Sequence, residues 1–279
     1  MKTSKLTIGF IGQGWIGKNY ADSFEDRGYT VVRYSLDKAH ASNKTKIKTC
    51  DIVFIAVPTP TTATGFDDSM VRKVIKLVGV GKVAVIKSTI VPGTTEKIQQ
   101  ENPKLYVMHS PEFLLERTAR YDADHPTRNI IGLPVMNKEY EDKAKLVLSV
   151  LPYSPFHKIL DAKSAELIKY ISNCFFVSKV VFFNIAYDMA EKLGLNFEDI
   201  QSGVVSDPRI GESHSKVNHA SGHTDKAGRG AGGHCFIKDF EAYLSVYKEI
   251  LGEDQGYKTL LEIRNKNIEL LHKSGKDFD

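Results

Sequence analysis

The sequence predicts an α/β fold, in which a parallel β-sheet covered by helices on both faces is followed by an α-helical domain built on one long central helix. Two observations carry this prediction. In the first half of the chain, short apolar runs alternate with helical stretches. In the second half, one apolar-periodic stretch extends from Ala162 to Leu193. We expect domains at 1–155 and 156–279, joined by a linker at Val147–Lys158, which contains two prolines.

Five strands are expected in the first domain. Each apolar run is short, rich in β-branched residues and bounded by glycine, proline or polar residues, which is typical of buried parallel strands. In the second domain, Gly194 should end the long helix as a C-cap, and two more helices should close the chain. The expected strands are Leu6–Ile11, Thr30–Tyr34, Ile52–Val57, Val83–Ile86 and Leu105–Met108, and the expected closing helices are about Phe240–Leu251 and Tyr257–Leu271.

The composition disfavours several classes of protein. Hydrophobic residues make up 42% of the chain and charged residues 26%, as in an ordinary globular protein. The formal net charge of +4 is small and spread along the chain, so we expect no nucleic-acid partner. Cys50, Cys174 and Cys235 are odd in number and far apart, which argues against a disulfide framework. Lys2 and Lys5 lead straight into a short strand, so we expect a cytoplasmic protein with no signal peptide or membrane segment.

A glycine pattern, GQGWIG, follows the first expected strand and runs from Gly12 to Gly17. Gly12 would make a tight turn, Gly14 would let the backbone approach a pyrophosphate, and Gly17 would let the next helix pack on the strand. Trp15 and Ile16 open that helix, whose positive end suits the pyrophosphate. Because a strand precedes the pattern and a helix follows it, we predict a Rossmann-type dinucleotide site.

The second expected strand should select the cofactor. An acidic residue near its end usually binds the ribose hydroxyls. Ser35 occupies the usual position, and the first acid is Asp37. Arg33 lies on the same strand and could face a 2′-phosphate, although an exposed position is the simpler interpretation. We predict NAD, with Asp37 as the ribose ligand.

Three further loops follow expected strands. The carboxyl ends of parallel strands share one edge of a sheet, where ligands of open sheets bind. Glu112 and Glu116 are four residues apart, so a helical turn would place both carboxylates on one face. The three loops are Val57–Thr61, which includes Pro58 and Thr59; Lys87–Thr95, which includes Ser88 and Thr89; and Ser110–Glu116, which includes Phe113, Leu114 and Leu115.

The second half of the chain offers an oxyanion-binding pair and a thiol. Lys169 and Asn173 are four residues apart on the long helix, so they share a face and could stabilise an oxyanion. Cys235 follows the small residues of Gly230–Gly233 and precedes Asp239. A cysteine behind glycines that permit close approach, in a chain without a pairing pattern, is a candidate nucleophile.

These segments, in this order, resemble the UDP-glucose/GDP-mannose dehydrogenase family, and most closely its UDP-glucose 6-dehydrogenases. Such enzymes oxidise the C6 alcohol of a nucleotide sugar to a carboxylate and reduce two NAD+ per turnover. The resemblance therefore implies an NAD-dependent oxidoreductase that serves polysaccharide biosynthesis. It extends from end to end of the chain and is carried by Gly12–Gly17, Val57–Thr61, Lys87–Thr95, Ser110–Glu116, Glu166–Asn173, Asp207–Gly211 and Gly230–Asp239.

The resemblance also implies a role for each catalytic residue. Lys169 and Asn173 would stabilise the alkoxide, with Asp239 and an ordered water nearby. Cys235 would capture the aldehyde as a thiohemiacetal, whose oxidation gives a thioester. Glu112 would assist hydrolysis of that thioester. Thr89 and Glu116 would help to position the water.

Binding contacts and a homodimer follow from the same resemblance. The long helix is similar to the family's dimerisation helix, and Arg209 resembles an arginine that reaches a neighbouring subunit's substrate. The implied cofactor-binding residues are Gly12, Gly14, Trp15, Ile16, Gly17, Asp37, Val57, Pro58, Thr59, Ser88, Thr89 and Glu116, and the implied substrate-binding residues are Phe113, Leu114, Leu115, Lys169, Asn173, Arg209, Gly232 and Gly233.

The chain departs from the family pattern in two places. Full-length members carry a third, carboxyl-terminal domain that contacts the UDP moiety, and we expect that domain to be absent here. The segment Glu212–Gly228 is longer than in many relatives and rich in histidine and lysine. We hypothesise that Lys216, Lys226 and Arg229 replace some of the diphosphate contacts.

Other functions remain open at this stage. Enzymes of the β-hydroxyacid dehydrogenase type share a similar first domain and a lysine–asparagine pair, but they perform one oxidation and need no thiol. A GDP-mannose or UDP-N-acetylhexosamine substrate, or an inactive NAD-binding remnant, would also fit. His219 and His223, with His214 and Asp225 close in sequence, could bind zinc on a helix. The intervening Ala-Ser-Gly disfavours that helix, so we expect no metal.

Overall fold

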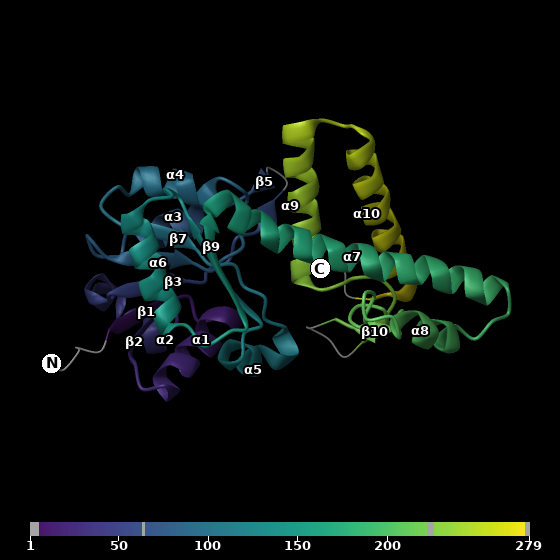
Figure 1. Cartoon of the computed structure of the whole chain (residues 1–279), viewed down its shortest axis with the longest axis horizontal. Coiled ribbons are helices and arrows are strands. Elements are labelled where there is room, and N and C mark those ends of the chain that lie inside the picture. Colours follow the sequence, from purple (N-terminus) through teal and green to yellow (C-terminus); the bar gives the residue numbers. More distant parts are fainter. Residues whose placement is uncertain (1–5, 63–64, 222–225, 277–279) are drawn as a thin grey trace. The chain divides into compact units, whose positions relative to one another are not determined.

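The computed structural model describes residues 6–62, 65–221 and 226–276, and the chain forms two compact units (Figure 1). The N-terminal unit is Met1–Lys169 and the C-terminal unit is Tyr170–Asp279. The predicted α/β class, a mostly parallel sheet followed by helices around one long helix, is confirmed. The predicted domain limits, 1–155 and 156–279, stay a prediction.

A seven-stranded sheet lies in the N-terminal unit, in the order β2-β1-β3-β6-β7-β8-β9. Neighbouring strands are parallel, except that β7 and β8 are antiparallel. The strand order reverses at β1, because β2 lies on one side of it and β3 on the other. Ligands of open α/β sheets bind at such a point. The strands are β1 (Thr7–Ile11), β2 (Thr30–Tyr34), β3 (Ile52–Ile55), β6 (Val83–Ile86), β7 (Tyr106–His109), β8 (Arg128–Leu133) and β9 (Phe156–Asp161).

Both faces of the sheet are buried. In β3, Ile52 and Phe54 enter one hydrophobic cluster, whereas Val53 and Ile55 enter the other, as the two-residue period of a strand requires. Helices contribute further side chains to both clusters. Strands β4 (Thr61–Thr62) and β5 (Gly65–Phe66) pair as a separate two-stranded antiparallel sheet. The helices of this unit are α1 (Trp15–Asp26), α2 (Lys38–Ala41), η1 (Lys44–Thr49), α3 (Ser69–Ile75), α4 (Thr94–Glu101), η2 (Glu116–Thr118), α5 (Ala119–Asp124) and α6 (Lys138–Val150).

The predicted linker at 147–158 is wrong. Helix α6 continues to Val150, and the edge strand β9 begins at Phe156. Pro152 and Pro155 lie in the short turn between these two elements. All six side chains of β9 are exposed or half-buried, so this strand has no buried apolar run by which the sequence could reveal it.

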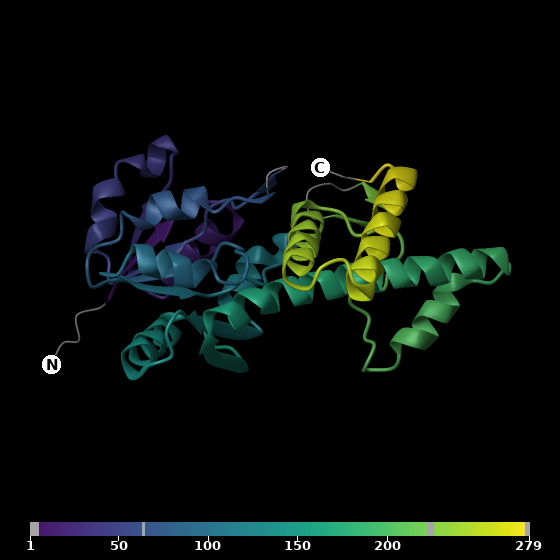
Figure 2. The same cartoon turned by 90° about the horizontal axis from the view of Figure 1, so that it is seen from above.

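The C-terminal unit is built on α7 (Ala162–Lys192), which begins in the N-terminal unit and has 31 residues. Val177, Val180 and Val181 of α7 pack with Phe240 of α9 in a hydrophobic cluster. Gly194 follows α7 with a φ of +69°, the left-handed conformation expected of a C-cap. Helices α9 and α10 lie side by side (Figures 1 and 2). The remaining elements are α8 (Phe197–Val205), β10 (His219–Ala220), β11 (Ala227–Gly228), α9 (His234–Leu251) and α10 (Gln255–Ser274).

Candidate active site

The loop between β1 and α1 fits the dinucleotide that the sequence predicts. Gly12 has a φ of +92°, and a Cβ there would lie 2.0 Å from the carbonyl oxygen of Ala56, so this turn requires glycine. A Cβ at Gly17 would lie 2.0 Å from the carbonyl oxygen of Gly12. By contrast, a Cβ at Gly14 would meet nothing within 4 Å. The space beside Gly14, just before Trp15 begins α1, is where a pyrophosphate would meet the helix N-terminus.

The residues after β2 suit an unphosphorylated ribose. Asp37 is exposed, and its Oδ2 accepts a hydrogen bond of 3.0 Å from Ser35 Oγ. Arg33 is paired with two carboxylates of α1, at 2.7 Å from Asp22 Oδ1 and 2.6 Å from Glu25 Oε2. Because this guanidinium is already neutralised, it is not offered to a 2′-phosphate. The arrangement supports NAD rather than NADP.

The loops after β3 and β6 meet, as expected of neighbouring parallel strands. Val57 N donates to Ser88 Oγ at 2.9 Å, and Ser88 Oγ donates to Val57 O at 2.7 Å. Thr59 Oγ1 donates to Thr89 O at 2.7 Å. Pro58 is exposed between these two contacts. Four of the predicted cofactor-binding residues are therefore joined at one edge of the sheet.

The loop after β7 is not helical, so the prediction that Glu112 and Glu116 share a helical face is wrong. Residues 111–115 form no helical turn, and Glu116 begins the short helix η2. Glu112 instead turns back onto its own backbone, where Oε1 accepts from Phe113 N at 2.7 Å and from Leu114 N at 3.1 Å. The carboxylate thus satisfies N–H groups that a helix would have paired. Leu115 follows with an exposed side chain.

The first turns of α7 are tied to the loop after β6. The Glu166 carboxylate is fully buried and accepts hydrogen bonds from Gly93 N at 2.6 Å, Thr95 N at 2.8 Å and Thr95 Oγ1 at 2.6 Å. Glu166 therefore caps α4 from another helix. Burial raises the pKa of Glu166 to about 7, against the lowering effect of these hydrogen bonds. One turn later, Lys169 Nζ lies 5.6 Å from the centroid of the Phe113 ring.

In the C-terminal unit, Asn173 of α7 is joined to Asp239 of α9. Asn173 Nδ2 donates to Asp239 Oδ2 at 2.6 Å, and Lys238 Nζ lies 2.6 Å from the other carboxylate oxygen. Both Asn173 and Asp239 are buried. Cys235 is exposed and lies four residues before Asp239 on α9, so the thiol and the carboxylate share a face of that helix.

The glycine-rich loop ends earlier than the sequence suggested, because α9 begins at His234 instead of near Phe240. Cys235 therefore lies in the first helical turn, where the helix dipole favours a negatively charged group. Gly233 is the N-cap with a φ of +86°, and Gly232 precedes it. Asn267 of α10 holds this loop, since its side chain bonds both N and O of Ala231 at 2.7 and 3.0 Å.

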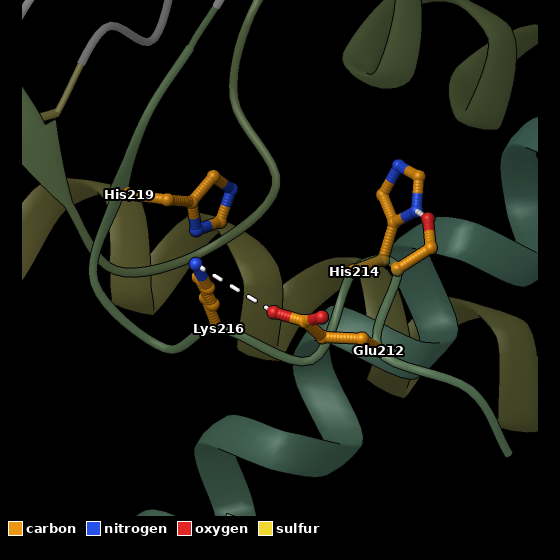
Figure 3. Close-up of a pocket in the computed structure, with 5 residues that line it drawn as sticks. Glu212, His214, Lys216 and His219 are labelled. Atoms are coloured by element: carbon orange, nitrogen blue, oxygen red, sulfur yellow. Dashed lines mark hydrogen bonds and ion pairs between the residues drawn. The ribbon is translucent and has the colours of Figure 1, made fainter. Parts of the chain in front are cut away.

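The long loop before α9 forms an open pocket of about 370 Å³ (Figure 3). The imidazole of His214 stacks on Phe176 of α7, with 4.1 Å between ring centroids. Burial, then the charge of Lys276, lowers the pKa of His219 to about 4. The pocket is lined by Glu212, Ser213, His214, Lys216 and His219. Figure 3 shows the ion pair between Lys216 and Glu212, which spans 3.8 Å.

The structure corrects part of the hypothesis for this loop. The Arg229 guanidinium is bound to α7, with Nε 2.8 Å from Asn184 Oδ1 and an NH2 group 2.6 Å from Asp188 Oδ1. Arg229 therefore anchors the loop instead of facing a diphosphate. Of the histidine set, His223 and Asp225 lie outside the described residues. Within the described residues, no group of three or more histidine, cysteine or acidic side chains could hold a metal ion.

Two surface features bear on assembly. Arg209 is exposed and pairs with Asp207 at 2.6 Å. Helix α7 also exposes an apolar stripe, whose members are at least half accessible and are spaced three, four or seven residues apart. By length and composition α7 could cross a membrane, and a single such helix is weak evidence of a membrane span. The stripe comprises Ile171, Phe175, Phe182, Ile185 and Met189.

Sequence reasoning missed three polar side chains that hold the predicted residues in place. Lys87 pairs with Glu112, Lys238 pairs with Asp239, and Asn267 binds the glycine-rich loop. The sequence signal for Lys87 was its position directly after β6, whose residues are all buried. No comparable signal marks Asn267, which lies 36 residues beyond the loop that it holds.

Comparison with known proteins matches both units to one family. Residues 33–148 match the NAD binding domain of the UDP-glucose/GDP-mannose dehydrogenase family, and residues 163–267 match its central domain. The first match confirms the prediction of NAD as the cofactor. The glycine loop at 12–17 precedes the matched region, so its assignment depends on the geometry described above.

Individual relatives agree with this match. A putative UDP-glucose 6-dehydrogenase of Bacillus subtilis, YtcA, is 32% identical over 249 residues, which cover 84% of this chain and 55% of the relative. The structure of a UDP-glucose dehydrogenase from Pyrobaculum islandicum aligns with a TM-score of 0.78 and 26% identity, covering 95% of this chain and 69% of that one. A UDP-D-ManNAc dehydrogenase from Pyrococcus horikoshii shares the fold, with a TM-score of 0.77, 22% identity and coverage of 96% and 69%. The chain spans about half the length of the curated relatives it matches.

Proposed function

Because the chain belongs to the UDP-glucose/GDP-mannose dehydrogenase family, we propose that it oxidises the C6 alcohol of a nucleotide sugar to a carboxylate. UDP-glucose is the proposed substrate, with two NAD+ and one water consumed and two NADH formed. One observation carries the proposal. Helix α9 presents Cys235 and Asp239 on one face, and Asp239 is bonded to Asn173 of α7.

The chain's own residues would hold the cofactor at the switch point of the sheet. The open space at Gly14 would admit the pyrophosphate, and Asp37 would bind the ribose hydroxyls. The joined loops of Thr59 and Thr89 would face the nicotinamide end. When bound, NAD+ accepts a hydride from the carbon that is being oxidised.

In the first oxidation, the chain must stabilise an alkoxide as the C6 hydroxyl loses its proton. The Lys169 ammonium and the Asn173 amide would supply that stabilisation from one face of α7. Asp239 fixes the orientation of the Asn173 amide by accepting its N–H. The released proton would leave through an ordered water beside Asp239.

In the second stage, Cys235 retains the aldehyde. Its sulfur adds to the C6 carbonyl carbon, and the thiol proton goes to the carbonyl oxygen, which gives a thiohemiacetal. Loss of a hydride and a proton then converts this adduct to a thioester. The position of Cys235 in the first turn of α9 favours the nucleophilic thiolate.

Hydrolysis completes the reaction. Water would add to the thioester carbon, the C–S bond would break, and Cys235 would recover its proton as the carboxylate leaves. Glu112 would act as the base for that water, with Thr89 and Glu116 helping to position it. The sugar would lie against the backbone of Phe113, Leu114 and Leu115.

We also propose that the protein is a cytoplasmic homodimer. The stripe on α7 is an apolar face of the kind that a second copy would cover. Arg209 is exposed and could reach a neighbouring subunit's substrate. The exposed Lys216 beside the open pocket of the long loop supports a contact with the substrate diphosphate.

The decisive experiment counts NADH per sugar. The purified protein is incubated with excess NAD+ and a limiting amount of UDP-glucose, GDP-mannose or a UDP-N-acetylhexosamine. We expect about two NADH for each UDP-glucose, with UDP-glucuronate as the product. A ratio near one, unchanged in Cys235→Ala, would instead indicate the β-hydroxyacid type of single oxidation. No NADH with any of these sugars would overturn the proposal.

A further inference from the structure

Lys87 is a buried lysine at the carboxyl end of β6. Its side chain is only 3% exposed, and an unpaired ammonium at such a position would be strongly destabilising. Its Nζ lies 3.0 Å from Glu112 Oε2, 3.3 Å from Ser110 Oγ and 4.5 Å from the centroid of the Tyr20 ring. The cation therefore has a dedicated partner, and that partner is the carboxylate proposed to activate water.

The Glu112 carboxylate is held at both oxygens. Oε1 is fixed by the N–H groups of Phe113 and Leu114, and Oε2 faces Lys87. Tyr20 of α1 lies beside the pair, and burial, followed by the charge of Glu112, raises the pKa of Tyr20 well above its usual value. Tyr20 is therefore a neutral phenol and supplies no charge to the ion pair.

The remaining groups around Glu112 do not balance its charge in the same way. Burial, reinforced by the charge of Lys87, lowers the pKa of His109 to about 3, so His109 is neutral near pH 7. Arg128 lies over the Phe113 ring, with Cζ 3.6 Å from its centroid. The titratable and charged groups that face this loop include Tyr20 on α1, Lys87 after β6, His109 on β7, Asp122 on α5, His125 after α5, Arg128 on β8 and Lys169 on α7.

Water has room beside the ion pair. Lys87 and Glu112 line a cavity of about 140 Å³, together with Tyr20, Asp122 and Arg128. Because a water molecule occupies roughly 30 Å³ of liquid, a few waters fit there. A base for hydrolysis needs a carboxylate with water within reach, and the Glu112 carboxylate lines this cavity.

We propose that Lys87 is a positioning residue for the hydrolytic step, in which its charge stabilises the Glu112 carboxylate and fixes it beside the cavity that would hold the attacking water. The inference depends on the proposed function, because it concerns the release of a thioester. Lys87 would have no part in either hydride transfer. Its loss should therefore slow product release and leave the formation of the covalent adduct intact.

The test uses Lys87→Met, with Lys87→Arg as the charge-conserving variant and Lys82→Met as a matched control. Lys82 precedes the same strand and pairs with Asp51 at 2.8 Å, outside the proposed site. In Lys87→Met we expect a burst of about two NADH per active site, followed by a steady rate about a hundredfold below that of the unaltered protein near pH 7. Mass spectrometry should find an acyl adduct on Cys235.

The pH dependence of the steady rate distinguishes a positioning role of Lys87 from a general loss of structure in the variant. The steady rate of Lys87→Met should recover at a higher pH than that of the unaltered protein, and Lys87→Arg and Lys82→Met should keep the original profile. An unshifted profile, with burst and steady rates reduced together, would overturn the role of Lys87. If the unaltered protein forms no NADH with nucleotide sugars, the proposed function has failed instead.

A double variant guards against misfolding of the single one. Lys87→Met with Glu112→Gln removes both charges of the pair, and a neutral pair avoids the cost of one unpaired buried charge. If Lys87 acts only through Glu112, the double variant should release product at the rate of Glu112→Gln alone. A further tenfold loss in the double variant would contradict the inference.

Discussion

At the scale of single residues, the proposed chemistry depends on where the three thiols lie. Cys235 is exposed at the start of α9, whereas Cys50 and Cys174 are buried in hydrophobic clusters. Burial raises the pKa of Cys50 to about 11 and raises that of Cys174 as well. Only one of the three thiols is therefore placed to act as a nucleophile.

Thiol reactivity provides a direct check on this contrast. In the folded protein, a disulfide reagent such as DTNB should modify one thiol quickly and the other two slowly. Cys235→Ala should remove the fast phase and abolish acid formation, because no thiohemiacetal can form. Cys174→Ala is the matched control and should keep the fast phase. Two or more fast thiols in the unaltered protein would contradict the proposed distinction.

Asp37 provides a second prediction at this scale. Asp37→Ala should raise the dissociation constant for NAD+ about tenfold, because a charge-assisted hydrogen bond to the ribose is lost. Trp15 is the single tryptophan and opens α1 beside the glycine loop, so its fluorescence can report binding. NADP+ should bind more weakly than NAD+ to the unaltered protein, since Arg33 is occupied by Asp22 and Glu25. Equal affinities would refute the assignment of these residues.

At the scale of elements, the sequence predicts the helices and strands whose apolar residues recur at a regular spacing. Strands buried on both faces read as continuous apolar runs, and five of the seven were predicted to within about two residues. Strands β8 and β9 were missed. Gly132 interrupts the apolar run of β8, and none of the six side chains of β9 is buried. The Lys87–Glu112 pair was missed because it joins residues 25 positions apart, through the adjacency of β6 and β7. Pairing of that kind depends on strand order, which a local pattern does not contain.

Glu166 links two elements and gives a prediction for stability. Its folded pKa of about 7 lies above the ordinary value of 4.5. Its contribution to stability is therefore fully present below about pH 4.5 and is lost as the pH rises through about 7. Relative to Glu166→Gln, the free energy of unfolding of the unaltered protein should fall by about 2 kcal/mol between pH 5 and pH 8.

Urea denaturation of both proteins at the two pH values would measure this difference. Glu166→Gln is the reference because it keeps the size of the side chain but cannot titrate in this range. Other titrating groups are common to both proteins and cancel in the comparison. A difference that stays constant with pH, or that rises, would show that Glu166 remains ionised throughout.

At the scale of the whole molecule, the residues proposed for catalysis are distributed over both units. The N-terminal unit holds the glycine loop, the joined loops of Ser88 and Thr89, and the Lys87–Glu112 pair. The C-terminal unit holds Cys235 with the Asn173–Asp239 pair. Helix α7 runs through both units and carries Lys169 and Asn173 one turn apart.

Oligomeric state is the prediction that belongs to this scale. Phe182→Glu with Met189→Glu should convert the dimer to a monomer in light scattering after gel filtration, because charge in an apolar interface is costly. Helical content by circular dichroism should not change. Ile250→Glu, at an exposed apolar position near the end of α9, is the control and should remain dimeric. A monomeric unaltered protein would refute the dimer.

The geometry of helix α7 also fixes the relative orientation of the side chains along it. Each residue added to a helix turns the following part by about 100° and advances it by about 1.5 Å. One residue inserted between Lys169 and Asn173 would move their side chains from about 40° apart to about 140° apart. The exposed stripe would rotate by about 100° relative to Glu166. The spacing along this helix is therefore constrained even where individual side chains are replaceable, and α7 should tolerate substitution far better than insertion or deletion.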